Sequence, residues 1–348
     1  MFLTHKVELR EFMKELTLSV KKLPTHVRTM ILQWNVFKST PMHTVSSSGM
    51  IIRTREDFQE DMQVTLLEET VSTHRGQGKI TMTMYPIAAE VIINYECHLH
   101  ALTFISEQNC KSYSTIQDYE IRLINYFEDL YKIKCVGFIR MKDGCGAQFW
   151  GYGTYCSAGL LLKTCSLDSI MYSRYAASEG KNLSHAIGSI LKRVIRNKIL
   201  KLKGNEENVI EMGIELEDTQ FRNYKDFFDW LKAQVALQEI DGFNKFKSFT
   251  VIDVNEPEFG HVIKENDIKK IVGLMKFHCM FVDNDMDSKE VMFRLATCDC
   301  NTCLLGNYRN CRESDVFGPW VRHNIQKMEK KQYYQKQKKV MMLLMMMT

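Results

Sequence analysis

The sequence has few prolines, no long apolar run and no strong excess of either charge. Only 5 of the 348 residues are proline, and neither an internal repeat nor a disordered linker is visible. No run of about 18 apolar residues occurs, so the sequence predicts no membrane span. The net charge of +4 is too small to argue for nucleic acid by itself, so only a local cluster of basic residues could do so.

The sequence also predicts no secretory signal peptide. Residues 1–10 mix Lys, Glu and Arg with apolar residues, whereas a signal peptide has a basic start followed by an apolar run. We therefore expect a protein that is not secreted and whose 11 cysteines are reduced thiols or metal ligands rather than disulfides. The length and the hydrophobic content of 45% are those of a globular protein with one or two domains.

Hydrophobic periodicity predicts the order strand, strand, strand, helix, strand in the first part of the chain. The strands are expected within 48–61, 77–95, 98–106 and 136–141, and an amphipathic helix over 114–132. Turn signals separate the first three strands, so an antiparallel meander is expected. Pro86 is expected at a bulge or a sheet edge, because proline cannot donate to a β-ladder.

The second part of the chain predicts further helices and short strands. Helices are expected over 184–202 and 219–237, with apolar residues at helical spacing. Short strands are expected at 169–176, 247–254, 271–282 and 290–297. The resulting division is a helical lead-in at 1–45, an α/β core at 46–240, a small β-rich unit at 245–320 and a basic, disordered tail at 321–348.

Asp143 is the most informative acidic residue. The apolar run 136–141 ends abruptly in Lys142-Asp143-Gly144, which indicates a carboxylate at the end of a buried strand. Folds of the α/β class place catalytic groups there, and a buried carboxylate needs a partner such as a metal ion. The alternative is an ordinary Asp-Gly turn.

The predicted helix over 184–202 has one basic face with no acidic residue within 181–203. Such a face is expected either to contact phosphates or simply to be solvated, and the sequence alone leaves both open. The candidate DNA-binding residues are Lys181, Lys192, Arg193, Arg196 and Lys198.

Four cysteines lie within the fourteen residues 298–311. Cys300 and Cys303 have the C-x2-C spacing with which two thiolates grip one tetrahedral zinc, and Cys311 offers a third ligand. The fourth ligand is open between Cys298, His278 and Cys279. With four ligands the zinc would be structural, and free buried thiols are the alternative.

The order of these motifs resembles a group of transposon-derived proteins that are similar to DDE transposases with an RNase H-like core and a C-terminal Cys cluster. The resemblance extends over about 24–315 and is carried by four segments. These are Pro24–Val27 with Gln33-Trp34, then Glu56–Glu60, Asp143–Phe149, and the set Cys300, Cys303 and Cys311.

The resemblance implies a mixed five-stranded sheet with flanking helices, and a catalytic site with Asp57 and Asp143. Two Mg²⁺ or Mn²⁺ ions would be held there by several carboxylates. The third acidic position of the family falls here on Ser184 or His185, and neither is a carboxylate. Glu179 is the nearest acidic residue, so an active enzyme would have to recruit it.

The sequence therefore predicts a transposase-derived DNA-binding protein whose catalysis is degenerate. The alternatives are an active metal-dependent DNA strand-transfer enzyme and an inert or structural relic of a mobile element. The resemblance implies a nuclear protein, with the cytoplasm as the other location, and it is compatible with a homo-oligomer.

Overall fold

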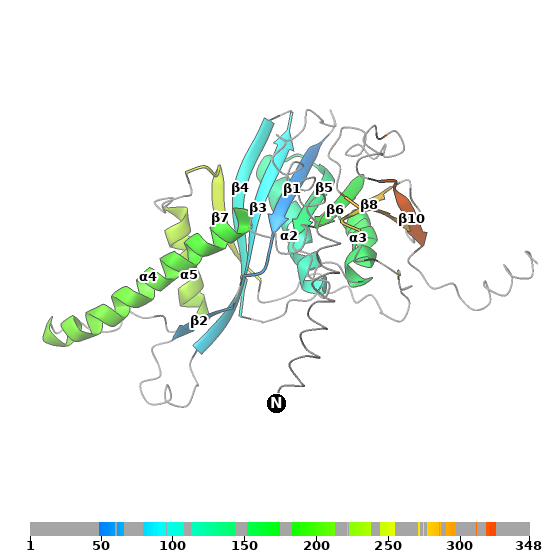
Figure 1. Cartoon of the computed structure of the whole chain (residues 1–348). Coiled ribbons are helices and arrows are strands. Elements are labelled where there is room, and N and C mark those ends of the chain that lie inside the picture. The colour runs from blue at the N-terminus through cyan, green and yellow to red at the C-terminus, as the bar shows by residue number, and fades with distance from the viewer. Residues whose placement is uncertain are drawn as a thin grey trace, which may run out of the picture.

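In the part of the chain that the computed structural model describes, ten strands form one mixed β-sheet, with helices packed on both of its faces (Figure 1). The strand order is β10-β9-β8-β6-β5-β1-β3-β4-β7, and β2 pairs with β3 outside this path. The structure describes residues 49–59, 61–65, 79–94, 96–107, 113–142, 152–174, 183–212, 221, 223–237, 244–254, 271, 274, 277–284, 286, 290–296, 311 and 318–324.

The centre of the sheet is an antiparallel meander. β1 (Met50–Glu56), β3 (Lys79–Ile93) and β4 (Glu96–Ser106) pair in sequence, and the short β2 (Met62–Thr65) adds to β3. Alternate residues of β3 point to opposite faces of the sheet, as the period of two requires. The predicted meander is confirmed.

Pro86 lies inside the central strand β3, and its pairing with Thr103 of β4 continues without a register shift. The regular pairing of β3 with β1 ends at Ile87, and the carbonyl of Pro86 accepts a bond from the Asp57 amide at 3.4 Å. In a strand the N–H and C=O of one residue face the same neighbour. The missing donor of Pro86 therefore faces the segment where β1 has just ended. The prediction of a bulge or a sheet edge at Pro86 was wrong.

The other side of β1 is extended by parallel strands. β5 (Cys135–Lys142) pairs in parallel with β1, and β6 (Ser169–Arg174) pairs in parallel with β5. Helix α2 (Tyr113–Tyr131) precedes β5, and α3 (Tyr152–Thr164) connects β5 to β6. Parallel neighbours need such crossover connections, so this part of the sheet is a mixed α/β arrangement.

Helix α2 packs on the sheet because its apolar residues recur every three or four positions. Ile116, Tyr119, Leu123 and Phe127 are buried as predicted, together with residues of α3 and the facing strands. Leu130 belongs to the same pattern but is 50% exposed, because it lies in the last turn of the helix. The helical spacing in the sequence predicts Leu130 on this buried face, and that prediction was wrong.

The opposite face of the sheet is covered by α4 (Leu183–Met212) and α5 (Tyr224–Ala236). Both form one apolar cluster with β3, β4 and β7, on the other side from α2 and α3 (Figure 1). The side chain of Asn223 caps α5 by accepting a bond from the Asp226 amide at 3.0 Å, which satisfies an otherwise unpaired N–H. Both predicted amphipathic helices are confirmed, although α4 continues to Met212 and α5 begins only at Tyr224.

The later strands extend both ends of the same sheet. β7 (Ser248–Asp253) pairs in parallel with β4 at one end. β8 (Cys279–Asp283), β9 (Glu290–Arg294) and β10 (Val321–Asn324) follow β6 in antiparallel fashion at the other. The strands expected in a small unit over 245–320 are thus additions to the two edges of the core sheet, and the domain boundaries themselves stay a prediction.

Two other expected regions lie outside the described residues, namely the helical lead-in at 1–45 and most of the tail at 321–348. The first four residues of that tail form β10, so the prediction of disorder was wrong there. Within the described part of the chain, no helix combines the length and the apolar character that crossing a bilayer requires.

Candidate functional site

Three parallel strands end side by side, and their carboxyl ends form one edge of the sheet that runs across the strands. The predicted acidic residues follow these strand ends. β1 ends at Glu56, β5 at Lys142 and β6 at Arg174. The register pairs Arg55 with Met141, and Lys142 with Arg174. Ligand sites of α/β proteins commonly lie at the carboxyl ends of such strands. This edge is therefore the candidate functional site.

Asp57 and His185 meet at this edge. Asp57 directly follows β1, and His185 lies in the first turn of α4. The Nε2 atom of His185 is 3.4 Å from Oδ2 of Asp57, and their side chains are 38% and 14% exposed. The Nδ1 atom of His185 is buried and has no hydrogen-bond partner among the described residues. The pair can therefore be reached by solvent, yet it leaves one ring nitrogen with unused bonding capacity.

The start of α4 is held against the segment after β1 by a second contact. An ideal Cβ at Gly188 would lie 2.6 Å from both Cγ and Cδ of Gln59, so any larger residue there would force the Gln59 side chain to shift. Gln59 is 9% exposed, and its Nε2 atom lacks a hydrogen-bond partner among the described residues. Phe58 packs on the Tyr85 ring with centroids 4.5 Å apart. These contacts fix where His185 stands relative to Asp57.

The structure separates the two residues that the resemblance left open for the third acidic position. Ser184 is fully buried, whereas His185 faces Asp57. Asp143, the next residue after the end of β5, and Glu179 both lie outside the described residues. The described part of the predicted catalytic set is therefore Asp57, with His185 beside it.

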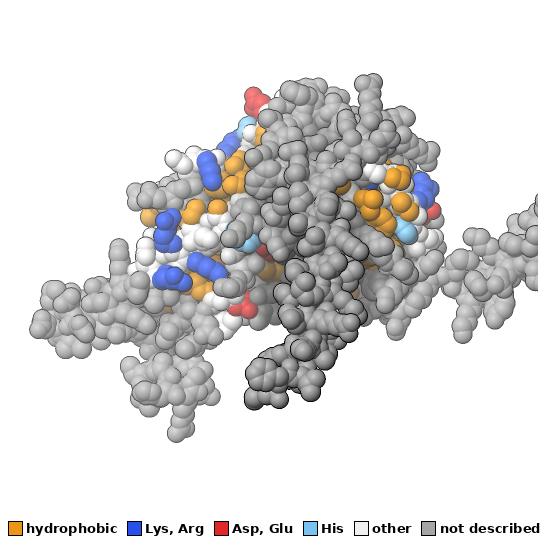
Figure 2. Space-filling model, in the orientation of Figure 1, with side chains coloured by type: hydrophobic (Ala, Val, Ile, Leu, Met, Phe, Trp, Pro, Cys, Tyr) orange, Lys and Arg blue, Asp and Glu red, His pale blue; other side chains and the backbone are white. Residues whose placement is uncertain are grey.

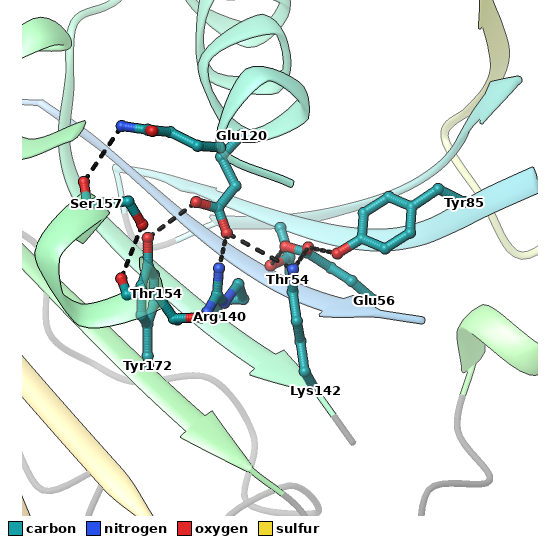
Figure 3. A network of polar contacts seen from close by, with 10 residues as sticks. Thr54, Glu56, Tyr85, Glu120, Arg140, Lys142, Thr154, Ser157 and Tyr172 are labelled. Carbon is teal, nitrogen blue, oxygen red and sulfur yellow. Dashed lines mark hydrogen bonds and ion pairs between the residues drawn. The ribbon is translucent and has the colours of Figure 1, made fainter. Parts of the chain in front are cut away.

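Four charged side chains fill the interior directly behind this edge (Figure 3). They are 0–2% exposed and come from β1, α2 and β5. Their acidic members are Glu56 and Glu120, and their basic members are Arg140 and Lys142. Two negative and two positive charges balance, which is what allows them to be buried together.

The contacts within this buried charge cluster are close. The Nζ atom of Lys142 is 3.0 Å from Oε2 of Glu56 and 3.7 Å from Oε1 of Glu120, so it lies between the two carboxylates. Arg140 forms an ion pair with Glu120, and its guanidinium stacks 3.4 Å from the centre of the Tyr172 ring. Lys142 therefore joins two carboxylates that come from a strand and a helix.

Hydroxyl groups complete the shell of the carboxylates (Figure 3). Tyr85 donates to Oε2 of Glu56 at 2.6 Å, and Thr54 donates to its other oxygen. Tyr172 donates to Oε2 of Glu120 at 2.9 Å. Such bonds offset the cost of removing a carboxylate from water.

The pKa values agree with a charged cluster at neutral pH. Burial by itself would raise the pKa of Glu56, but the charges of Lys142 and Arg140 and the bonds from Thr54 and Tyr85 outweigh it, so the pKa is lowered. Burial lowers the pKa of Lys142 to about 8, with repulsion from Arg140 adding to the effect and the two carboxylates opposing it. Both groups thus remain charged at pH 7.

Sequence reasoning missed this cluster, although one signal was present. Glu120 lies four residues after Ile116 and three before Leu123, on the buried face of α2. A carboxylate at that position needs a buried partner, and the basic residues Arg140 and Lys142 at the end of an apolar strand are candidates for it.

The predicted DNA-binding residues lie on α4, except Lys181, which is outside the described residues. Arg193 and Arg196 are exposed, whereas Lys192 and Lys198 are half-buried. Basic side chains are visible in Figure 2 on the side of the molecule where Figure 1 places α4 and α5. The same helix thus carries His185 and a basic face.

The predicted zinc site is only partly within the described residues. Cys298, Cys300 and Cys303 lie outside them. Cys311 is buried, and its sulfur accepts a hydrogen bond from Nη1 of Arg294 at 3.3 Å. Among the residues that the structure describes, no three His, Cys, Asp or Glu side chains are grouped so as to hold a metal ion. Zinc binding therefore stays a prediction.

Two of the three candidates for the fourth zinc ligand, His278 and Cys279, lie just before and at the start of β8. Cys279 is fully buried, and the Ser173 hydroxyl lies 3.9 Å from its sulfur. The backbone of His278 accepts a bond from the Arg174 amide at 3.0 Å. Neither contact decides between them.

The chain belongs to the family described as "Domain of unknown function (DUF8701)", which matches residues 37–293. The match covers the central sheet and the strand ends described above. No curated protein matches the chain.

Three solved structures are similar to the chain in part. They include NurA bound to dAMP and manganese, with 11% identity over 67% of this chain and 46% of that one, and a TM-score of 0.18. NurA with manganese has 10% identity over 94% of this chain and 61% of that one, with a TM-score of 0.18. The chain thus spans about half to three fifths of the length of these NurA chains.

Proposed function

We propose that this chain is a DNA-binding protein derived from a DDE transposase, and that its RNase H-like core has lost efficient metal-dependent cutting. One observation carries the proposal, namely the pairing of His185 with Asp57 at 3.4 Å. The resemblance aligns His185 with the third acidic residue of the family, where a carboxylate is expected. The contact is consistent with this alignment, because it places His185 beside Asp57, the first acidic residue. An imidazole there supplies no negative charge for Mg²⁺, which prefers oxygen ligands.

The sheet topology supports the RNase H-like part of the proposal. The five strands β4-β3-β1-β5-β6 stand in this order, and only β3 runs against the others. A helix follows β4 and another follows β5. This is the order of a mixed five-stranded RNase H-like sheet, with the first strand in the middle and the first acidic residue at its end.

The DNA-binding part rests on the face of α4. Lys192 and Arg196 follow His185 by seven and eleven residues, so all three lie along one stripe of the helix. Given the rise of about 1.5 Å per residue, the stripe extends about 16 Å from His185. A DNA backbone that runs along it would pass the Asp57–His185 pair and meet the two cations in succession. We further propose a nuclear location, which the resemblance to transposases implies.

The DNA-binding test is the salt dependence of affinity for duplex and single-stranded DNA. The variant Lys192→Gln/Arg196→Gln should lower the magnitude of the slope of log K against log salt by about 2, because two phosphate contacts are lost. The matched control, Lys132→Gln/Lys163→Gln, removes two exposed cations near α2 and α3 on the other face and should leave the slope unchanged. Equal effects of both pairs would refute α4 as the binding face.

The test of lost catalysis is the nicking of supercoiled plasmid in Mg²⁺ and in Mn²⁺. The proposal expects no nicking above that of Asp57→Asn in either metal, while DNA binding persists. Efficient nicking that Asp57→Asn or Asp143→Asn abolishes would instead support the active strand-transfer enzyme, with Glu179 as the next residue to replace. Absence of both nicking and binding would favour the relic of a mobile element.

A further inference from the structure

The buried charge cluster, Glu56, Glu120, Arg140 and Lys142, is arranged like a cation site in which a side-chain ammonium group stands in place of a metal ion. Two carboxylates from separate elements, β1 and α2, converge on one point. The ammonium group of Lys142 occupies this point, at 3.0 Å and 3.7 Å from the two nearest carboxylate oxygens. Carboxylate oxygens that converge on one point are among the ligands that a hard divalent cation requires.

We propose that the ammonium group of Lys142 takes the place of a divalent cation between Glu56 and Glu120, so that removing it opens a Mn²⁺ site there. The protein thus carries a covalently attached cation behind the strand ends, and this part of its core needs no metal ion to hold the two carboxylates together. The inference does not depend on DNA binding.

The surroundings of Lys142 support the assignment. Its side chain is 2% exposed, so water contributes little to its charge balance, and its two ion-pair partners provide the compensation. The remaining oxygens of the two carboxylates are already bonded, to Thr54 and Tyr172. The two oxygens that face Lys142 also accept bonds, Oε2 of Glu56 from Tyr85 and Oε1 of Glu120 from Arg140. An ion in the place of the ammonium group would share these oxygens with the two donors.

The distances also leave room for an ion. Mg²⁺ binds carboxylate oxygen at about 2.0–2.1 Å and keeps several waters. Each carboxylate would move inward by less than 2 Å, and water would fill the volume that the lysine side chain leaves. Because Arg140 stays in place, the occupied site would carry one positive charge in excess, so we expect moderate rather than tight binding.

The experiment is calorimetric titration of Mn²⁺ into the full chain with Lys142→Ser. We expect Lys142→Ser to bind Mn²⁺ at one site more than the wild-type protein. The Mn²⁺ affinity of this site should be at least tenfold higher than that of any wild-type site that Glu120→Gln affects. The matched control is Lys142→Ser/Glu120→Gln, which removes one carboxylate of the pair and should abolish that additional site. This control leaves Asp57 and Asp143 intact, so it also distinguishes Mn²⁺ binding by Glu56 and Glu120 from Mn²⁺ binding by Asp57 and Asp143.

Thermal unfolding keeps the proposal testable if Lys142→Ser is poorly folded without metal. At a Mn²⁺ concentration about one hundred times the Kd, its Tm should rise by about 4 °C, and the double variant should not respond. Failure of Mn²⁺ either to bind or to restore folding in Lys142→Ser would overturn the proposal. So would Mn²⁺ binding by the wild-type protein that Glu120→Gln abolishes, because the lysine would then not occupy the site.

Discussion

Replacing Gly188 with alanine should destabilise the protein, although alanine is the better helix former. Alanine in a helix interior is favoured over glycine by about 1 kcal/mol. Its Cβ, however, would lie 2.6 Å from Cγ and Cδ of Gln59 and 3.0 Å from its Nε2 atom. Overpacking of this kind costs about 1–3 kcal/mol. We therefore expect Gly188→Ala to lower the free energy of unfolding by about 1 kcal/mol.

The sign should reverse once Gln59 is shortened. In a Gln59→Ala background the atoms that meet the new Cβ are gone, so Gly188→Ala should raise the free energy of unfolding by about 1 kcal/mol. The coupling between the two positions is then about 2 kcal/mol, which is well above the error of a double-mutant cycle. Urea unfolding of the four proteins measures it.

The matched control is Ser189→Ala, one residue further along α4, whose side chain is exposed. It should change stability by less than about 0.5 kcal/mol in either background. A coupling below about 0.5 kcal/mol between positions 59 and 188 would refute the close approach. In that case the contact would not fix His185 beside Asp57 either.

Three other predictions concern buried and paired charges. Burial, with the charges of Lys247 and His98, lowers the pKa of His100 to about 4. Because the unfolded chain binds the proton more readily, stability should fall by about 2–3 kcal/mol between pH 7 and pH 4.5, and this fall should disappear in His100→Gln. Arg140→Met should cost about 3–5 kcal/mol in urea unfolding, because Glu56 and Glu120 then share the single positive charge of Lys142, and adding Glu120→Gln should recover part of the loss. His185→Asp should lower the Tm in EDTA, because two carboxylates then face each other, and Mg²⁺ should restore it; an equal Tm in both buffers would contradict this.

The elements of the core could be predicted because local patterns determine them. The antiparallel meander, α2, β5, β6 and the two helices of the other face all follow from apolar residues at strand or helix spacing. The places of β7 and of the strands after β6 could not be predicted in the same way, since their hydrophobic pattern does not say which edge they join. Pro86 misled the prediction because the rule against proline in central strands holds only where a neighbour needs its N–H.

The candidate site was predictable only in part. Asp57 could be selected from its motif, but its contact with His185 depends on how α4 packs on the sheet, and no local pattern encodes that packing. Glu120 is similar, because its partners Arg140 and Lys142 are twenty or more residues away in the sequence. Signals of this kind become visible only when a charged residue interrupts an apolar face, as Glu120 does in α2.

The balanced charges behind the strand ends also restrict how this sequence can change over generations. Replacing any one of the four residues leaves an uncompensated charge in the interior, so a protein with a single substitution is poorly folded. Only joint replacements, such as Glu120 together with Arg140, avoid that intermediate. Among descendants of this gene we therefore expect the four residues to be kept or exchanged in pairs.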